Sequence, residues 1–358
     1  MTQTKEQLVL QRIEQVRARK AKLKEERITM SHGAGGKATQ TLINALFLEA
    51  FRNPLLEPLE DQAVFTVGDK RLAFTTDSFV VSPLFFSGGN IGDLAVNGTV
   101  NDLAVSGARP LYLSAGFILE EGFPVEDLQR IVRSMSNAAT TAGALIATGD
   151  TKVVQKGKAD GCFINTSGVG VIERDVHLGA ASVKPGDAVI VSGPIGDHGV
   201  TIMVARAELD LVSDITSDTA PLSGLVDCLL EATSNVHCLR DATRGGVATI
   251  LNEIAQAAKV TIVMDEDAIP VRNEVRGACE ILGLDPLYVA CEGRLVAIVD
   301  EAVADVALRA MHSHPLGGGA AIIGTIKDAP PGLVLLKTQF GGTRIVDLLV
   351  GDPLPRIC

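Results

Sequence analysis

Short strand patterns alternate with helical patterns along most of this 358-residue chain, and this alternation limits the fold more than any other feature. Apolar runs of strand length cover residues 71–82, 144–154, 163–172, 188–192, 260–264, 295–299 and 320–325. Helical periodicity covers residues 94–107, 124–143, 200–211, 222–233, 241–259 and 302–311. Such alternation predicts an α/β fold in which helices cover the faces of sheets.

A chain of this length is expected to form two domains. The turn Lys184-Pro185-Gly186-Asp187 is the best boundary, because a new strand pattern follows it directly. We therefore expect an N-terminal domain over 28–183 and a C-terminal domain over 184–350. Residues 1–27, with eight Lys or Arg and four Glu, predict a solvated basic helix outside both domains.

The overall charge and the cysteines exclude several functional classes. A net charge of −11 disfavours a nucleic-acid partner, which would select basic patches. No apolar run approaches the roughly 20 residues that span a bilayer, so a membrane role is not expected. The six cysteines are widely spaced and form no CxxC pair, which favours reduced thiols in the cytoplasm over disulfides or a zinc site.

Four acids stand at strand ends or among small residues: Asp77, Asp102, Asp150 and Asp241. Asp150 is expected just past the end of its strand, where α/β sheets place ligand-binding groups. Two glycine-rich helix starts, at Gly33–Gly36 and Gly245–Gly246, would expose N–H donors to an anion. Each acid alone is typical of a turn or a cap, but together these features indicate a triphosphate held through Mg²⁺.

The last eight residues, 351–358, end on a thiol and include Pro353 and Pro355. Because proline cannot join a helix or an interior strand, we expect an extended, unpaired, flexible tail. A frayed end whose last residue happens to be Cys358 is the simpler interpretation. A sulfur carried into a nearby pocket is the alternative, since eight extended residues reach roughly 26 Å.

Several stretches together resemble the HypE family of hydrogenase maturation factors, which are carbamoyl dehydratases. The resemblance runs from about residue 28 to residue 358, and the chain departs from it only in the extension 1–27. It rests on the stretches His32–Gly36, Thr75–Ser78, Pro83–Gly92, Gly98–Ala104, Thr148–Val153, Arg240–Gly246 and Pro355–Cys358, of which the last, Pro-Arg-Ile-Cys, is the most specific.

The resemblance implies an α/β fold of the α+β type, the two-domain aminoimidazole-ribotide synthetase-like (PurM-like) ATP-binding fold. The N-terminal sheets of a homodimer would pair into a barrel, with ATP near the interface. The implied metal-binding or phosphate-binding acids are Asp77, Asp102, Asp150 and Asp241. The implied ATP-binding residues are Gly33, Gly35, Gly36, Asn101, Thr151, Gly245 and Gly246.

The implied reaction begins with a carbamoyl group that the carbamoyltransferase HypF places on the Cys358 sulfur. ATP-dependent dehydration would convert this group to a thiocyanate, and the cyano group would pass to iron on a HypC–HypD complex for [NiFe]-hydrogenase. Glu292 is the candidate base, although an acid in a turn before a strand is also common without function. Lys152 would polarise the amide oxygen or steady the phosphate.

Two other readings stay open at this point. One is another ATP-using member of the same superfamily, such as a selenophosphate synthetase, although no cysteine precedes Cys162 here. The other is a non-enzymatic carrier or scaffold that binds ATP and presents a cysteine tail. ATP turnover that depends on the modified tail would separate both from the dehydratase.

Overall fold

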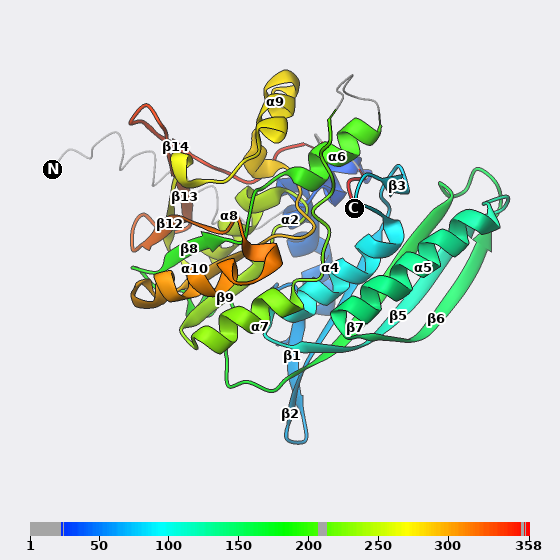
Figure 1. Cartoon of the computed structure of the whole chain (residues 1–358), viewed down its shortest axis with the longest axis horizontal. Coiled ribbons are helices and arrows are strands. Elements are labelled where there is room, and N and C mark those ends of the chain that lie inside the picture. Colours follow the sequence, from blue (N-terminus) through cyan, green and yellow to red (C-terminus); the bar gives the residue numbers. More distant parts are fainter. Residues whose placement is uncertain (1–22, 24, 207–212, 352–353, 355) are drawn as a thin grey trace.

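Two β-sheets with covering helices build the protein in this computed structural model, which describes residues 23, 25–206, 213–351, 354 and 356–358 (Figure 1). The first sheet has the strand order β1-β2-β7-β5-β6, and all its neighbours are antiparallel except the parallel pair β5 and β6. Its strands are β1 (Ala63–Val67), β2 (Lys70–Phe79), β5 (Arg109–Glu120), β6 (Leu145–Val154) and β7 (Cys162–Ile172).

The second sheet has the order β14-β13-β10-β12-β8-β11-β9, in which only β10 and β13 are parallel. Its strands are β8 (Ala188–Val191), β9 (Val236–Asp241), β10 (Thr261–Asp265), β11 (Leu295–Val299), β12 (Ala321–Lys327), β13 (Leu333–Lys337) and β14 (Thr343–Ile345). A two-stranded ribbon, β3 (Phe85–Phe86) and β4 (Gly89–Asn90), precedes the first long helix.

The described helices are α2 (Lys37–Leu42), α3 (Leu48–Phe51), α4 (Ile91–Val105), α5 (Val125–Ala142), α6 (Asp197–Ala205), α7 (Ser223–Ala232), α8 (Gly246–Ala258), α9 (Asn273–Leu282) and α10 (Ala304–His312). Most of them follow the predicted pattern with a few shifted ends, but α9 was not predicted. The predicted helix over 200–211 starts earlier, and part of its end lies outside the described residues. The predicted helix over 1–27 lies almost wholly outside them.

Strands β8 and β11 are apolar at every position because helices cover both faces of the second sheet. Ala188 and Ile190 face the core formed with α7 and α10, while Val189 and Val191 face the core formed with α8. This alternation follows from the two-residue period of a strand. Burial on both faces explains why these segments read as continuous apolar runs.

Helix α4 connects the two halves of the molecule. It packs on β2 and β7 and against α5, and it also contacts β9 and α7 (Figure 1). Small residues such as Ala95 and Gly98 allow this close approach, because a Cβ at position 98 would lie 2.9 Å from the Phe79 ring. Asn101 and Asp102, near the C-terminal end of α4, therefore sit where the halves meet.

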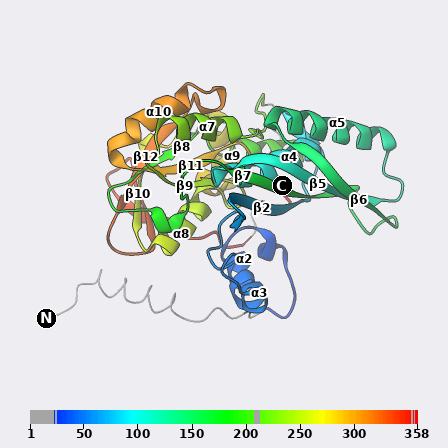
Figure 2. The ribbon, with the colours of Figure 1, turned by 90° about the horizontal axis from the view of Figure 1, so that it is seen from below.

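One face of the first sheet carries exposed apolar side chains. Figure 2 shows α4 and α5 on one side of this sheet. Tyr112 and Ile118 of β5 point away from the buried Leu113 and Ala115 and are exposed. The edge strand β6 is exposed along nearly its whole length.

Asp150 does not lie past a strand end as predicted. It sits inside β6, where it is paired with Gly116 of β5, because the pairing of β5 and β6 continues through Val154. The proposed division into domains 28–183 and 184–350 stays a prediction. Among the described helices, none is long and apolar enough to cross a membrane.

Candidate functional site

Three carboxylates meet where the two sheets face each other. Asp61 lies just before β1, Asp102 lies on α4, and Asp241 ends β9. One oxygen of each lies within 4.8 Å of the others. Carboxylate oxygens are the ligands that Mg²⁺ prefers, so this cluster fits a hard divalent cation. Asp61 is not among the acids singled out from the sequence, although it also stands at a strand boundary.

Burial makes this cluster costly to ionise. Desolvation and the neighbouring acids raise the pKa of Asp102 well above its usual range. Desolvation likewise raises the pKa of Asp241 to about 6, although Arg240 opposes the shift. The Asp241 Oδ2 atom is buried and accepts no hydrogen bond among the described residues. A bound cation would supply the missing partner.

Arg240 is the main counter-charge beneath the cluster. Its guanidinium lies 3.0 Å from Asp61, 2.7 Å from Glu60 and 2.9 Å from Glu253. These pairs raise its pKa against the opposing effect of burial. Because Arg240 is shared among three acids, it does not neutralise Asp102 or Asp241 fully, and a net negative charge remains on the metal-facing side.

A groove of about 1000 Å³ opens beside the cluster. Its lining includes Gly33, Gly35, Asp61, Asp241 and Arg244. The groove is large enough for a nucleotide, since ligand sites commonly enclose about 300–1,000 Å³.

The first glycine-rich stretch borders this groove at Gly33 and Gly35, while Gly245 of the second lines a neighbouring cavity. Gly36 is the N-cap of α2, and a Cβ there would lie 2.3 Å from the Leu349 oxygen. Gly246 has φ +60° and begins α8, and a Cβ there would meet the Leu287 oxygen at 2.5 Å. Only glycine permits both close approaches. Gly245 is the N-cap of α8, so the positive end of that helix dipole lies at the neighbouring cavity.

Cys358 is buried and lines a second cavity of about 140 Å³. Gly33 and Arg244 line both this cavity and the groove, so the two spaces are neighbours. Burial raises the pKa of the Cys358 thiol, and Arg244 opposes that effect. Arg244 also pairs with Asp77 at 3.6 Å. Arg244 is therefore the cation that acts on the thiol, while Arg356 pairs with Asp160.

Glu292 reaches the same place from the segment before β11. Its side chain is buried, and its Oε1 atom has no hydrogen-bond partner among the described residues. Desolvation and the charges of Asp241 and Asp77 raise its pKa well above the usual range. Glu292 in turn raises the pKa of the Cys358 thiol. Thiol, carboxylate and Arg244 thus form one electrostatic unit.

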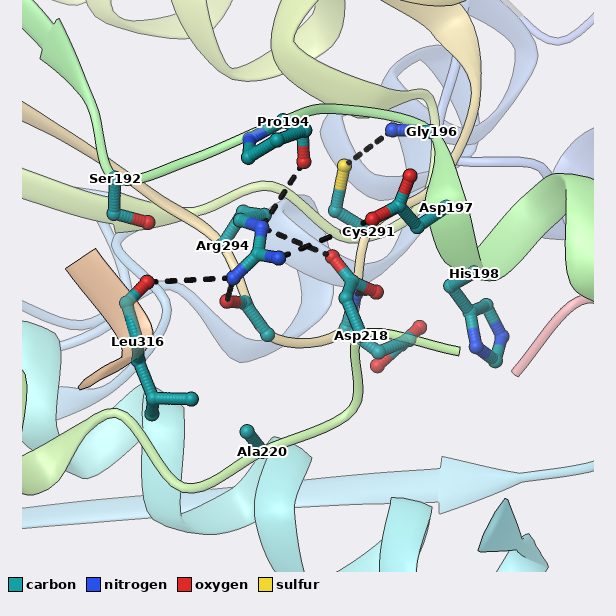
Figure 3. A network of polar contacts seen from close by, with 12 residues as sticks. Ser192, Pro194, Gly196, Asp197, His198, Asp218, Ala220, Cys291, Arg294 and Leu316 are labelled. Carbon is teal, nitrogen blue, oxygen red and sulfur yellow. Dashed lines mark hydrogen bonds and ion pairs between the residues drawn. The ribbon is translucent and has the colours of Figure 1, made fainter. Parts of the chain in front are cut away.

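The buried polar network around Arg294 and Asp218 (Figure 3) also holds the Glu292 main chain. The Glu292 N–H donates to Asp218 Oδ1 at 3.0 Å, and its carbonyl accepts from Asn101 at 3.3 Å. Arg294 lies between Asp218 and Asp197, at 3.6 and 3.9 Å, and donates to the Pro194 carbonyl. Asn101 thus makes its described hydrogen bonds to protein groups, although the sequence resemblance places it among ATP ligands.

The tail ending in Cys358 is not unpaired, so that prediction is wrong for residues 356–358. Val80 N donates to the Cys358 oxygen at 3.0 Å, and Ser82 N donates to the Arg356 oxygen at 3.3 Å. Ile357 is buried in the core of the first half. The end of the tail therefore docks beside residues 80–82, which follow β2, whereas Pro353 and Pro355 lie outside the described residues.

Three predicted site residues lie away from this cluster. Asp150, Thr151 and Lys152 are exposed on β6, and the Lys152 ammonium lies 2.8 Å from Asp150. The hydrogen bond from Lys152 lowers the pKa of Asp150. Within one copy of the chain, the structure does not bring these residues to Asp241, Glu292 or Cys358.

Comparisons with known proteins agree with the geometry. Residues 59–172 match the N-terminal domain of AIR synthase related proteins, and residues 184–335 match the C-terminal domain. The carbamoyl dehydratase HypE of Rhizobium leguminosarum bv. viciae is 53% identical over 341 residues, covering 95% of this chain and 97% of its own.

Two solved structures are similar over most of the chain. One is that of a HypE–HypF complex, with a TM-score of 0.82 and 48% identity over 86% of this chain and 99% of the other. The other is that of a HypE protein in complex with ATP, with a TM-score of 0.78 and 47% identity over 93% of this chain and 100% of the other.

Proposed function

The chain belongs to the HypE carbamoyl dehydratases of the AIR synthase related family, and from this premise we propose how its residues carry out the reaction. A carbamoyl group on the Cys358 sulfur is dehydrated to a thiocyanate with hydrolysis of ATP. The thiocyanate supplies the cyanide ligand for the iron of [NiFe]-hydrogenase. The observation that supports this best is the burial of the Cys358 thiol beside Glu292 and Arg244, next to the acid-lined groove.

The chemistry explains the need for ATP. The carbamoyl oxygen is a poor leaving group, and its transfer onto the γ-phosphoryl of ATP releases ADP and makes phosphate the leaving group. The C–O bond then breaks, and the carbon–nitrogen bond becomes triple. Overall the oxygen leaves in phosphate, both nitrogen protons are lost, and the sulfur keeps its bond to carbon.

Glu292 is placed to take a nitrogen proton. Its carboxylate is buried, and its raised pKa makes the ionised form a strong base. Arg244, which lines both cavities, would stabilise negative charge that develops on the oxygen or the phosphate. Asp77 holds Arg244 from the other side at 3.6 Å.

Mg²⁺ and ATP fit the groove. Asp61, Asp102 and Asp241 would hold the cation, which when bound would neutralise phosphate charge. Gly33, Gly35 and Gly36, with the start of α8 at Gly245 and Gly246, would surround the phosphates. The support is the unsatisfied Asp241 oxygen and the carboxylate-only donor set.

A homodimer would bring β6 into the site. The exposed apolar face around Tyr112 and Ile118 would be covered when two first sheets pair into a barrel. Asp150, Thr151 and Lys152 would then act toward the ATP of the second copy. Asp150 and Lys152 are the strand neighbours of Gly116 and Ile118, so their exposed side chains lie on this same face, which supports the arrangement.

HypF is the proposed carbamoyl donor, and a HypC–HypD complex is the proposed acceptor of the cyano group. The structure of a HypE–HypF complex among similar proteins supports the first assignment. We place the reaction in the cytoplasm. The six free thiols accord with a reducing compartment.

Mass spectrometry of the peptide that contains Cys358 tests the proposal. After reaction with HypF, carbamoyl phosphate and ATP, the peptide should gain about 43 Da and then lose about 18 Da. Cys358→Ala should abolish both changes, while Cys228→Ala, at a partly exposed cysteine, should leave them intact. A modified Cys358 that never loses water in the presence of ATP would overturn the proposal in favour of a carrier.

A further inference from the structure

Donors from three separate segments hold three consecutive main-chain oxygens of the tail. Arg206 donates to the Arg356 oxygen at 2.6 Å, and Val80 N donates to the Cys358 oxygen at 3.0 Å. Between them, His198 Nε2 lies 2.7 Å from the Ile357 oxygen. The contacts involve the tail's main chain, so they leave the Cys358 sulfur available to carry a group.

The hydrogen bonds of His198 determine its protonation. Thr219 N donates to Ser217 Oγ at 3.1 Å, so the Ser217 hydroxyl is free to donate to His198 Nδ1 at 2.8 Å. The proton of the neutral imidazole then sits on Nε2, facing the Ile357 oxygen. Burial keeps the ring neutral, because desolvation lowers its pKa to about 4. His198 is thus a fixed donor at physiological pH.

The same two segments also hold Glu292. His198 follows Asp197, which lies 3.9 Å from Arg294 (Figure 3). Ser217 precedes Asp218, which accepts from the Glu292 N–H. The His198–Ser217 hydrogen bond therefore joins the part of the chain that holds the tail to the part that holds the base. A shift of either partner would change the position of the sulfur relative to the carboxylate.

We propose that His198 and Ser217 form a positioning pair that docks the tail main chain at Ile357 and so aligns Cys358 with Glu292. This inference rests on the proposed function for its catalytic consequence, but the docking itself does not. Neither side chain is assigned contact with the reacting atoms. Arg206 assists from the other side of the tail.

Alkylation of cysteines in the full-length protein measures the docking without any catalysis. Cys358 is protected when docked, whereas Cys228 is partly exposed and serves as an internal control. His198→Leu removes the donor and should increase the iodoacetamide alkylation rate of Cys358 about tenfold, the effect of one lost buried hydrogen bond. The rate at Cys228 should stay unchanged. His198→Gln, whose amide can donate from a similar position, should restore much of the protection.

A milder variant keeps the test decisive if His198→Leu disturbs the fold. Ser217→Ala removes only the hydroxyl that fixes the imidazole and should speed alkylation of Cys358 several-fold. Arg206→Gln should do the same. Unchanged protection of Cys358 in Ser217→Ala and Arg206→Gln would overturn the proposal.

A second readout separates positioning from a purely structural role. In His198→Leu, water loss from the carbamoylated tail at saturating ATP should slow about tenfold. The KM for ATP should stay near that of the protein without the substitution. A KM for ATP that rises as much as the rate of water loss falls would contradict a role in tail positioning. If the protein without any substitution shows no water loss from its carbamoylated tail, the dehydratase proposal fails, but the alkylation result still decides whether His198 and Ser217 dock the tail.

Discussion

Two aspartates that look alike in the sequence lie in opposite environments. Asp241 ends β9 inside the molecule, where desolvation raises its pKa to about 6. Asp150 stands on the edge strand β6, where a hydrogen bond from Lys152 lowers its pKa. Both follow a short apolar run and adjoin small or hydroxyl residues. The difference shows that an acid in such a motif becomes a metal-site candidate only through what surrounds it.

The comparison also separates what one copy of the chain can do from what two copies are needed for. The buried cluster, Glu292 and Cys358 come together within one chain. Among the described residues, the charged side chains of Asp150 and Lys152 on β6 form an ion pair only with each other. If both regions serve one reaction, the second must do so across an interface.

The largest expected effect is at the buried cluster. Asp241→Asn should slow ATP-dependent water loss from the carbamoylated tail by at least about 100-fold, because it removes a carboxylate that supports the cation and the phosphate charge. Single-turnover mass spectrometry at fixed Mg²⁺ measures this. Asp267→Asn, at an exposed acid on the same half, is the control and should react at the normal rate. A normal rate for Asp241→Asn would contradict a role of the carboxylate cluster in the reaction.

Disruption of the exposed face of the first sheet should have the next largest effect. Ile118→Asp places a charge in the proposed interface and should convert a dimer to a monomer in light scattering, with about a tenfold loss of activity. Val132→Asp is a matched control, because Val132 is 46% exposed on α5 and Ile118 is 44% exposed on β5. Dimers that persist in Ile118→Asp would contradict pairing through this face.

Mixed subunits test whether β6 acts across the interface. Lys152→Ala and Glu292→Gln should each be impaired alone. When the two are mixed and allowed to exchange, about a quarter of the activity should return, because half of the dimers are hybrids and each hybrid has one complete site. No recovery after verified subunit exchange would assign Lys152 to the site of its own chain.

The smallest expected effect concerns stability. The pKa of Asp241 is about 6 in the folded protein and 3.8 in its unperturbed state, so the Mg²⁺-free protein loses stability as pH rises through this window. Mg²⁺ binds the ionised cluster and should therefore raise the Tm more at pH 7.5 than at pH 5. The gain at saturation should be about 3–5 °C by calorimetry and should shrink in Asp241→Asn. An equal gain at both pH values would contradict metal binding at these carboxylates.

Local patterns in the sequence were enough for much of the fold. The apolar run at 295–299 is β11, and the small residues after Gly92 form the buried helix α4. These segments were predictable because an element that is buried on all sides consists almost entirely of apolar or small residues, which exposed elements do not. By contrast, α9 and β13 were not recognised, and Asp150 was placed past a strand that in fact continues, because the pairing with β5 extends it.

The candidate site was predictable in part. The structure brings Glu292, Asp102 and Asp241 inward, and their roles stay predictions. Asp102 and Asp241 were singled out by their positions among small residues or at a strand end, whereas Glu292 was chosen through the family resemblance. Asp61, His198 and Arg206 were missed. Asp61 carries the same strand-boundary signal as the others, and His198 lies in a glycine-flanked helix start. Arg206 has no local signal, because its partner Arg356 lies 150 positions away.

The sequence alone determined most of the elements and the family, and it singled out Cys358, since each depends on local residue types or on motifs read in order. Only the tertiary structure decided that the tail docks, that Arg244 rather than Arg356 acts on the thiol, and that Asp150 faces solvent. The physical reason is that pKa, burial and hydrogen-bond pairing are properties of neighbours in space. Those neighbours come from segments that the chain brings together only on folding.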